Sequence, residues 1–131
     1  MKPRVLVVED EPDIRDLIVL TLTNHGYETS GVDCGEAAWI EAAKKTPSVL
    51  VLDILLPDMD GLSLCEMFRK TPRTSKTPIL MLTAYATLQA RGIAAEAGAN
   101  DFMTKPFSPR ELALRVDKLL HHNAFTPAAT K

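Results

Sequence analysis

The chain has 131 residues, of which 46% are hydrophobic and 24% are charged, and this suits a single globular domain with a sizeable core. Its formal net charge of −2 gives it no basic surface, so nucleic acid and anionic membranes are not expected as direct partners. It contains no run near the ~20 apolar residues of a membrane span, and its two cysteines lack the spacing of a zinc site, which favours a reducing, cytoplasmic setting.

Five short apolar runs alternate with five segments of helical periodicity. In chain order the runs are RVLVV at 4–8, YETSGV at 27–32, SVLVL at 48–52, PILML at 78–82 and NDFM at 100–103. The first helical segment, 12–25, is followed by Gly26, which suits a helix C-terminal cap. The last begins after Ser108, which can cap its first turn. The alternation predicts an α/β fold, a doubly wound five-stranded parallel sheet with helices on both faces.

Polar residues stand where the apolar runs end. They are Glu9, Asp10 and Glu11 after the first run, Asp53 after the third, Thr83 and Ala84 after the fourth, and Thr104, Lys105 and Pro106 after the fifth. Each taken alone has an ordinary explanation, such as a helix cap, a turn residue or a solvated charge. Because ligands of such sheets bind beyond the carboxyl ends of the strands, the joint arrangement predicts a functional site at that edge.

Four motifs carry a resemblance to a known family. They are VLVVEDE at 5–11, LVLDILLPDMDG at 50–61, PILMLTA at 78–84 and GANDFMTKPFSPREL at 98–112. On these motifs the chain resembles the response-regulator receiver family of two-component signalling, and the last motif is most similar to receivers of the winged-helix transcription-factor subfamily. The resemblance implies a flavodoxin-like (βα)5 fold with strand order 2-1-3-4-5. It also implies a receiver domain over 1–121. Residues 122–131 lack helical periodicity and contain a proline, so they are expected to form a C-terminal tail or the start of a linker.

The acidic residues are predicted to bind Mg²⁺. Three carboxylates from neighbouring strands repel one another, and a hard divalent cation relieves that repulsion. Because Mg²⁺ takes about six oxygen ligands and usually keeps several waters, Asp10 and Asp53 are expected as direct ligands and Glu9 through a water. The resemblance adds one more ligand, the backbone carbonyl of Leu55.

Asp53 is then the expected phosphoacceptor. A carboxylate can form an acyl phosphate, and phosphoryl transfer needs mainly positioning and charge neutralisation, which Mg²⁺ and Lys105 can supply. The resemblance makes Thr83 the hydroxyl switch, with the small Ala84 leaving room for a phosphoryl oxygen, and makes Phe102 the rotating aromatic. From the residues alone, Phe102 is more simply a core position. The expected donor is a sensor histidine kinase or a phosphotransfer protein.

This chemistry describes a signalling phosphoacceptor that catalyses its own phosphorylation and loses the group slowly, and we do not expect an enzyme with a separate substrate. The position two after the acceptor is Leu55 and the position two after the switch hydroxyl is Tyr85, and neither orients an attacking water well. The resemblance also implies a cis peptide bond between Lys105 and Pro106.

A phosphorylation-favoured homodimer is also expected. In the subfamily that the chain resembles, charge pairs cross the face formed by the fourth helix, fifth strand and fifth helix. The matching residues here are Arg91 with Glu111 and Asp101 with Arg115, together with Leu114. An ordinary solvated face remains the alternative, because exposed ion pairs contribute only ~0 to 1 kcal/mol each.

Three functions other than a receiver phosphoacceptor are the alternatives for this sequence. An aspartate-nucleophile phosphatase would usually have a second acid where Leu55 stands, and the acids after the first run would repel the phosphate of a flavin carrier. A degenerate receiver, acting as a phosphorylation-independent protein-binding module, is the third. Glu9 and Phe102 depart from the family's frequent Asp and Tyr, and neither change threatens phosphorylation.

Overall fold

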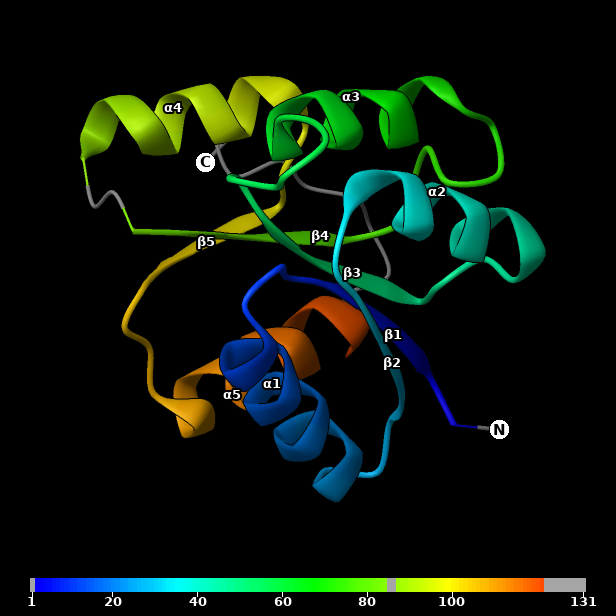
Figure 1. Ribbon diagram of the computed structural model, residues 1–131, viewed down its shortest axis with the longest axis vertical. Coiled ribbons are helices and arrows are strands. Elements are labelled where there is room, and N and C mark those ends of the chain that lie inside the picture. Colours follow the sequence, from blue (N-terminus) through cyan, green and yellow to red (C-terminus); the bar gives the residue numbers. More distant parts are fainter. Residues whose placement is uncertain (1, 85–86, 122–131) are drawn as a thin grey trace.

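Strands and helices alternate along the whole chain in the computed structural model, which describes residues 2–84 and 87–121 (Figure 1). The strands are β1 (Arg4–Val8), β2 (Glu28–Val32), β3 (Val49–Asp53), β4 (Ile79–Thr83) and β5 (Asp101–Thr104). The helices are α1 (Pro12–Asn24), α2 (Gly35–Lys44), α3 (Gly61–Lys70), α4 (Leu88–Ala97) and α5 (Pro109–His121). The predicted tail, 122–131, and Tyr85 lie outside the described residues.

The strands form one parallel sheet in the order β2-β1-β3-β4-β5, which confirms the predicted fold class and strand order. In this order β1 and β3 are neighbours, and Val8 is paired with Leu52. The residues that follow Val8 therefore lie beside the last residue of β3, Asp53. On the other side, Asp53 is paired with Leu82 of β4.

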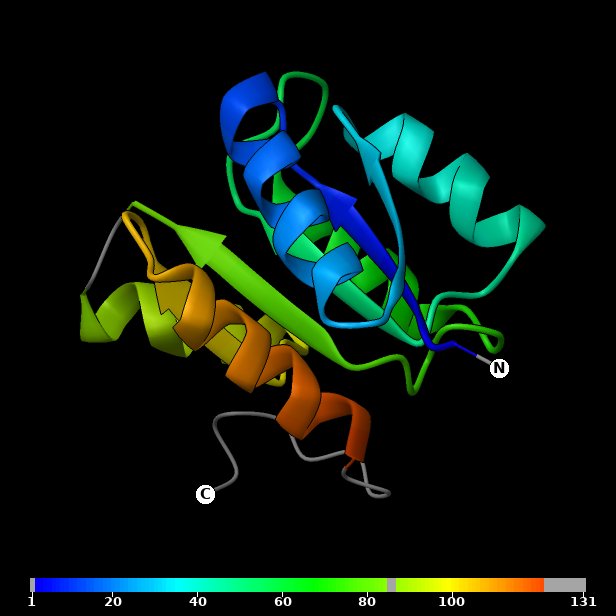
Figure 2. The same cartoon turned by 90° about the horizontal axis from the view of Figure 1, so that it is seen from below.

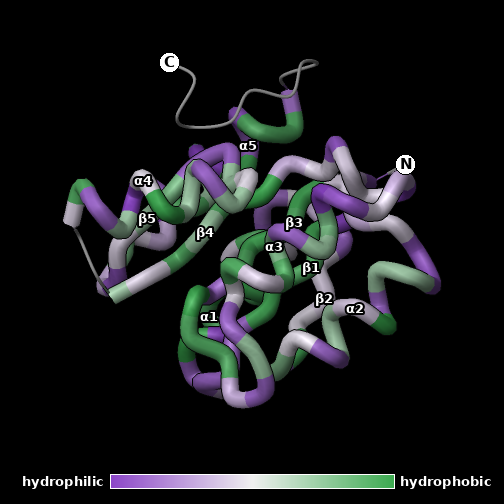
Figure 3. Tube along the Cα trace, turned by 90° about the horizontal axis from the view of Figure 1, so that it is seen from above, coloured by the Kyte–Doolittle hydropathy of each residue, from purple (hydrophilic) through white to green (hydrophobic). Residues whose placement is uncertain are grey.

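Helices cover both faces of the sheet. Figures 1 and 2 show α1 and α5 together on one face, and α2, α3 and α4 on the other. Because side chains alternate along a strand, β1 and β3 send Val5, Val7, Val49 and Val51 to the first face and Leu6, Val8, Leu50 and Leu52 to the second. The central strands are accordingly hydrophobic along most of their length, whereas the helices alternate between hydrophobic and hydrophilic residues (Figure 3).

The predicted helix signals are found at the ends of two helices. Gly26 follows α1 with a φ of 92°, a left-handed conformation that glycine adopts without strain. Ser108 caps α5, because its Oγ accepts a hydrogen bond of 3.3 Å from the amide of Glu111.

The helices of the described residues are short. The longest, α1 and α5, have 13 residues each, and none of those described is long and apolar enough to cross a membrane.

Candidate phosphoacceptor and metal site

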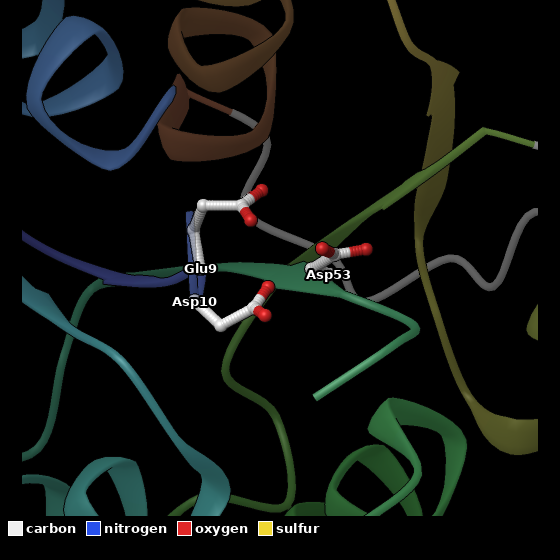
Figure 4. Close-up of side chains that lie close together, drawn as sticks. All are labelled: Glu9, Asp10 and Asp53. Carbon is white, nitrogen blue, oxygen red and sulfur yellow. The ribbon is translucent and has the colours of Figure 1, made fainter. Parts of the chain in front are cut away.

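Three carboxyl groups meet at the carboxyl ends of β1 and β3. Glu9 and Asp10 follow β1, and Asp53 is the last residue of β3 (Figure 4). One carboxylate oxygen from each residue lies within 4.8 Å of the other two. Glu9 and Asp53 are buried, whereas Asp10 is exposed to solvent. The structure thus brings together all three acids that the sequence proposed as side-chain metal ligands.

Lys105, which follows β5, reaches into this cluster. Its Nζ lies 2.7 Å from Oε1 of Glu9 and donates a hydrogen bond of 2.9 Å to Oδ2 of Asp53. The Lys105 backbone is held at the same edge, because its amide donates a hydrogen bond of 2.7 Å to the carbonyl of Thr83. The peptide bond between Lys105 and Pro106 is cis, as predicted.

Burial and charge act together on the ionisable groups of the cluster. Burial raises the pKa of Glu9 above its ordinary value, and the charge of Asp53 adds to this rise. Hydrogen bonds from Lys105 and the Glu11 amide lower the pKa of Glu9 but do not cancel the rise. Burial alone would lower the pKa of Lys105, but its hydrogen bonds to Glu9 and Asp53 and their charges outweigh burial and raise it. The Lys105 ammonium therefore contacts two of the three clustered acids, Glu9 and Asp53.

This donor set fits a hard divalent cation. All three side chains offer oxygen atoms, which Mg²⁺ prefers over nitrogen and sulfur. Glu9 is engaged on both oxygens, since Oε2 accepts a hydrogen bond of 3.1 Å from the Glu11 amide and Oε1 pairs with Lys105. Asp53 is engaged in the same way, by Lys105 on Oδ2 and by the Leu55 amide on Oδ1, so these contacts do not decide which buried acid would bind a cation directly. Asp10 is exposed to solvent, where a hydrated cation can reach it.

The loop between β3 and α3 is folded tightly against Asp53. The Leu55 amide donates a hydrogen bond of 3.3 Å to Oδ1 of Asp53, and the Gly61 amide donates one of 2.7 Å to the carbonyl of Ile54. A Cβ at Gly61 would meet the backbone oxygen of Asp53, so only glycine fits there. Our sequence analysis did not single out Gly61, although the glycine in LPDMDG was the available signal.

The proposed switch residues lie on β4 and β5. Thr83 ends β4 and is buried, and it is paired in register with Thr104, the residue before Lys105. Ala84 follows it and is exposed. Phe102 is only 4% exposed and packs in the core on the α2–α4 side of the sheet. The guanidinium carbon of Arg91 lies 5.5 Å from the centre of the Phe102 ring, a cation–π contact from α4.

The residues of the predicted dimer face make their contacts within one chain. Arg115 donates to Oδ1 of Asp101 and to Oε2 of Glu111, both at 2.9 Å. Leu114, also on α5, is 52% exposed. A pair between Asp101 and Arg115 of two copies would therefore have to replace an ion pair that each chain already makes.

Comparison with protein families gives a match over most of the chain. Residues 5–117 match the family described as the response regulator receiver domain. Over 98% of its length the chain is 36% identical to a DNA-binding dual master transcriptional regulator, RpaA, of Synechocystis. It is 39% identical over 94% of its length to the alkaline phosphatase synthesis transcriptional regulatory protein PhoP of Bacillus subtilis. The chain spans only 54% and 50% of these two relatives.

Solved structures of similar length have the same fold. A putative response regulator from Chloroflexus aurantiacus superposes with a TM-score of 0.89 at 39% identity, covering 93% of this chain and all of its own. The chemotaxis response regulator CheY4 of Vibrio cholerae gives a TM-score of 0.88 at 30% identity, covering 92% of this chain and all of its own.

Proposed function

The chain belongs to the response regulator receiver domain family, and on this premise we propose that Asp53 accepts a phosphoryl group from a phosphohistidine. The donor is a sensor histidine kinase or a phosphotransfer protein, and the reaction takes place in the cytoplasm. The observation that carries the proposal is the contact of the Lys105 ammonium with Asp53 beside two further acids, at the carboxyl edge of the sheet.

The transfer is a displacement at phosphorus. An oxygen of Asp53 forms a bond to phosphorus, the bond between phosphorus and the imidazole nitrogen breaks, and the electron pair stays on the imidazole. Lys105 balances the charge of the equatorial oxygens, because its Nζ already lies 2.9 Å from Oδ2 of Asp53. Asp10, Asp53 and the Leu55 carbonyl would hold Mg²⁺, which would supply further charge neutralisation. The domain therefore promotes its own phosphorylation and acts on no separate substrate.

The conformational response to phosphorylation then involves β4, β5 and the helices beside them. The Thr83 hydroxyl donates a hydrogen bond to a phosphoryl oxygen, and Ala84 leaves space for that oxygen. Phe102 moves when Thr83 moves. The contact between the Phe102 ring and Arg91 couples this movement to α4. The altered α4–β5–α5 face favours a homodimer. The names of both relatives describe transcriptional regulators, and that of RpaA describes DNA binding, which is a property of that longer protein.

Intact-mass measurement tests the phosphoacceptor role. The protein is incubated with acetyl phosphate and Mg²⁺, and the expected product carries one phosphoryl group. The adduct should be absent when Mg²⁺ is chelated and absent in Asp53→Ala. An unmodified wild-type protein would instead support a degenerate receiver that binds partners without phosphorylation.

A further inference from the structure

Asp58 caps a helix that lies far from it in the sequence. It belongs to the loop between β3 and α3, but its carboxylate accepts hydrogen bonds from the first turn of α2. The Gly35 amide donates to Oδ1 at 2.8 Å and the Glu36 amide donates to Oδ2 at 2.9 Å. The residue before α2, Cys34, makes no side-chain capping bond to the helix amides. The first turn of α2 therefore depends on a side chain from the β3–α3 loop.

The next residue in the loop packs against the same turn. The Met59 side chain covers Gly35 so closely that a Cβ at Gly35 would lie 2.5 Å from Cγ and Sδ of Met59. Met59 is partly buried against the core on this side of the sheet. Asp58 and Met59 together fix the middle of the loop to the beginning of α2, the first by hydrogen bonds and the second by packing.

The two ends of this loop are fixed to the phosphoacceptor site. At one end the Leu55 amide bonds to the Asp53 carboxylate at 3.3 Å. At the other end Asp60 forms a β-bridge with Leu55 and caps α3 through a 2.9 Å bond from the Leu62 amide. Any movement of the loop away from α2 would therefore shift Leu55, whose carbonyl is a proposed Mg²⁺ ligand.

We propose that Asp58 is a positioning residue for the metal site: by capping α2 it holds residues 54–60 so that Leu55 presents its carbonyl to bound Mg²⁺. The inference rests on the proposed function, and it goes beyond it by including α2, which contributes no ligand. The Glu36 and Gly35 amides lower the pKa of Asp58 below its ordinary value, so the capping carboxylate is ionised at neutral pH. Groups that orient a ligand typically change metal affinity by about 10- to 100-fold when removed.

A Mg²⁺ titration followed by backbone amide chemical shifts tests this role. Asp58→Ala is expected to bind Mg²⁺ at least about tenfold more weakly than the wild type. The Mg²⁺ affinity of Asp58→Asn, which keeps one good acceptor oxygen, should lie between those of the wild type and Asp58→Ala. If Asp58→Ala does not fold, Asp58→Asn still tests the role. Ser108→Ala is the matched control, because it removes a helix cap from α5 and should bind Mg²⁺ like the wild type.

Amide hydrogen exchange in the same samples supplies a second readout. Coupling between two sites is reciprocal, so Mg²⁺ should slow exchange at Gly35 and Glu36 in the wild type and not in Asp58→Ala. If Asp58→Ala and Asp58→Asn bind Mg²⁺ with wild-type affinity, Asp58 only stabilises α2 and the inference is overturned. Asp10→Ala separates this from a failure of the proposed function, since unchanged affinity in Asp10→Ala would overturn the metal site itself.

Discussion

The amide of Leu55 donates a hydrogen bond of 3.3 Å to the carboxylate of Asp53, which places Leu55, a residue that is 59% exposed, next to the proposed phosphoacceptor. A hydrocarbon side chain at this place can cover the phosphoryl group and cannot orient an attacking water. The other residue proposed to shield the group, Tyr85, lies outside the described residues.

Leu55→Asn is therefore expected to shorten the lifetime of the phosphorylated protein severalfold, because an amide can orient a water toward phosphorus. The measurement is the decay of the phosphorylated species by intact mass after the phosphodonor is removed. Leu88→Asn is the control, since Leu88 is 87% exposed on α4 and is not a site residue. Equal lifetimes in the wild type and Leu55→Asn would contradict the shielding explanation.

Gly61→Ala should destabilise the protein by about 1 to 3 kcal/mol, because the added methyl group has no room beside the backbone oxygen of Asp53. Urea unfolding at 25 °C measures the change. Gly92→Ala is the matched control, since a Cβ at that position in α4 meets no atom within 4 Å. It should stabilise the protein by about 0.5 to 1 kcal/mol, and an equal loss in both variants would argue against a close approach at Gly61.

The Tyr27 hydroxyl donates a hydrogen bond of 2.9 Å to Asp117 of α5, and Tyr27→Phe should cost about 1 kcal/mol of unfolding free energy at neutral pH. Burial and Asp117 raise the pKa of Tyr27 from 10.0 to about 12. The stability due to this shift is complete below pH 10 and is lost as pH rises toward 12, because only the unfolded state ionises there.

Tyr27→Phe lacks this titration, so the stability advantage of the wild type over the variant should shrink above pH 10. Urea unfolding of both proteins at a series of pH values measures the difference. Taking the difference removes the contributions of the other groups that titrate in this range. An advantage that stays constant from neutral pH to pH 11 would contradict the assignment.

Arg115→Glu should prevent the homodimer proposed for the phosphorylated state. Sedimentation velocity at tens of micromolar protein with beryllofluoride and Mg²⁺ is expected to give a dimer for the wild type and a monomer for the variant. Because Arg115 pairs with Asp101 and Glu111 of its own chain, the dimer must exchange these contacts, and its stability is expected to be modest. Arg110→Glu makes the same charge change at an exposed position of α5 and should leave the dimer intact.

Much of the fold followed from local patterns in the sequence. The apolar runs predicted both ends of every strand to within one residue. The acids that follow these runs predicted the edge of the sheet at which the site lies. The second strand begins at Glu28 and not at Tyr27, because the Tyr27 amide donates a hydrogen bond of 3.2 Å to the Leu22 carbonyl at the end of α1. The fifth begins at Asp101 and not at Asn100, whose amide donates a hydrogen bond to the Ile79 carbonyl and whose side chain accepts one from the Ile79 amide.

Contacts between distant segments could not be predicted in this way. Asp58 and the α2 amides that it caps are 22 and 23 residues apart, and no spacing rule links them. The pairing of Arg115 with Asp101 within one chain depends on how α5 packs beside β5. The site acids were predictable because each stands at the end of a strand or directly after one. The groups that hold them in place come from loops whose paths the sequence pattern does not define.

The most direct test of the phosphoacceptor role is chemical identification of the modified residue. Borohydride reduces an aspartyl phosphate to homoserine, so the protein is treated with acetyl phosphate and Mg²⁺, reduced, digested and sequenced by mass spectrometry. Our account predicts homoserine at position 53 and at no other aspartate, and none when Mg²⁺ is chelated. Homoserine at another position, or equal phosphoryl uptake by Asp53→Ala, would contradict it.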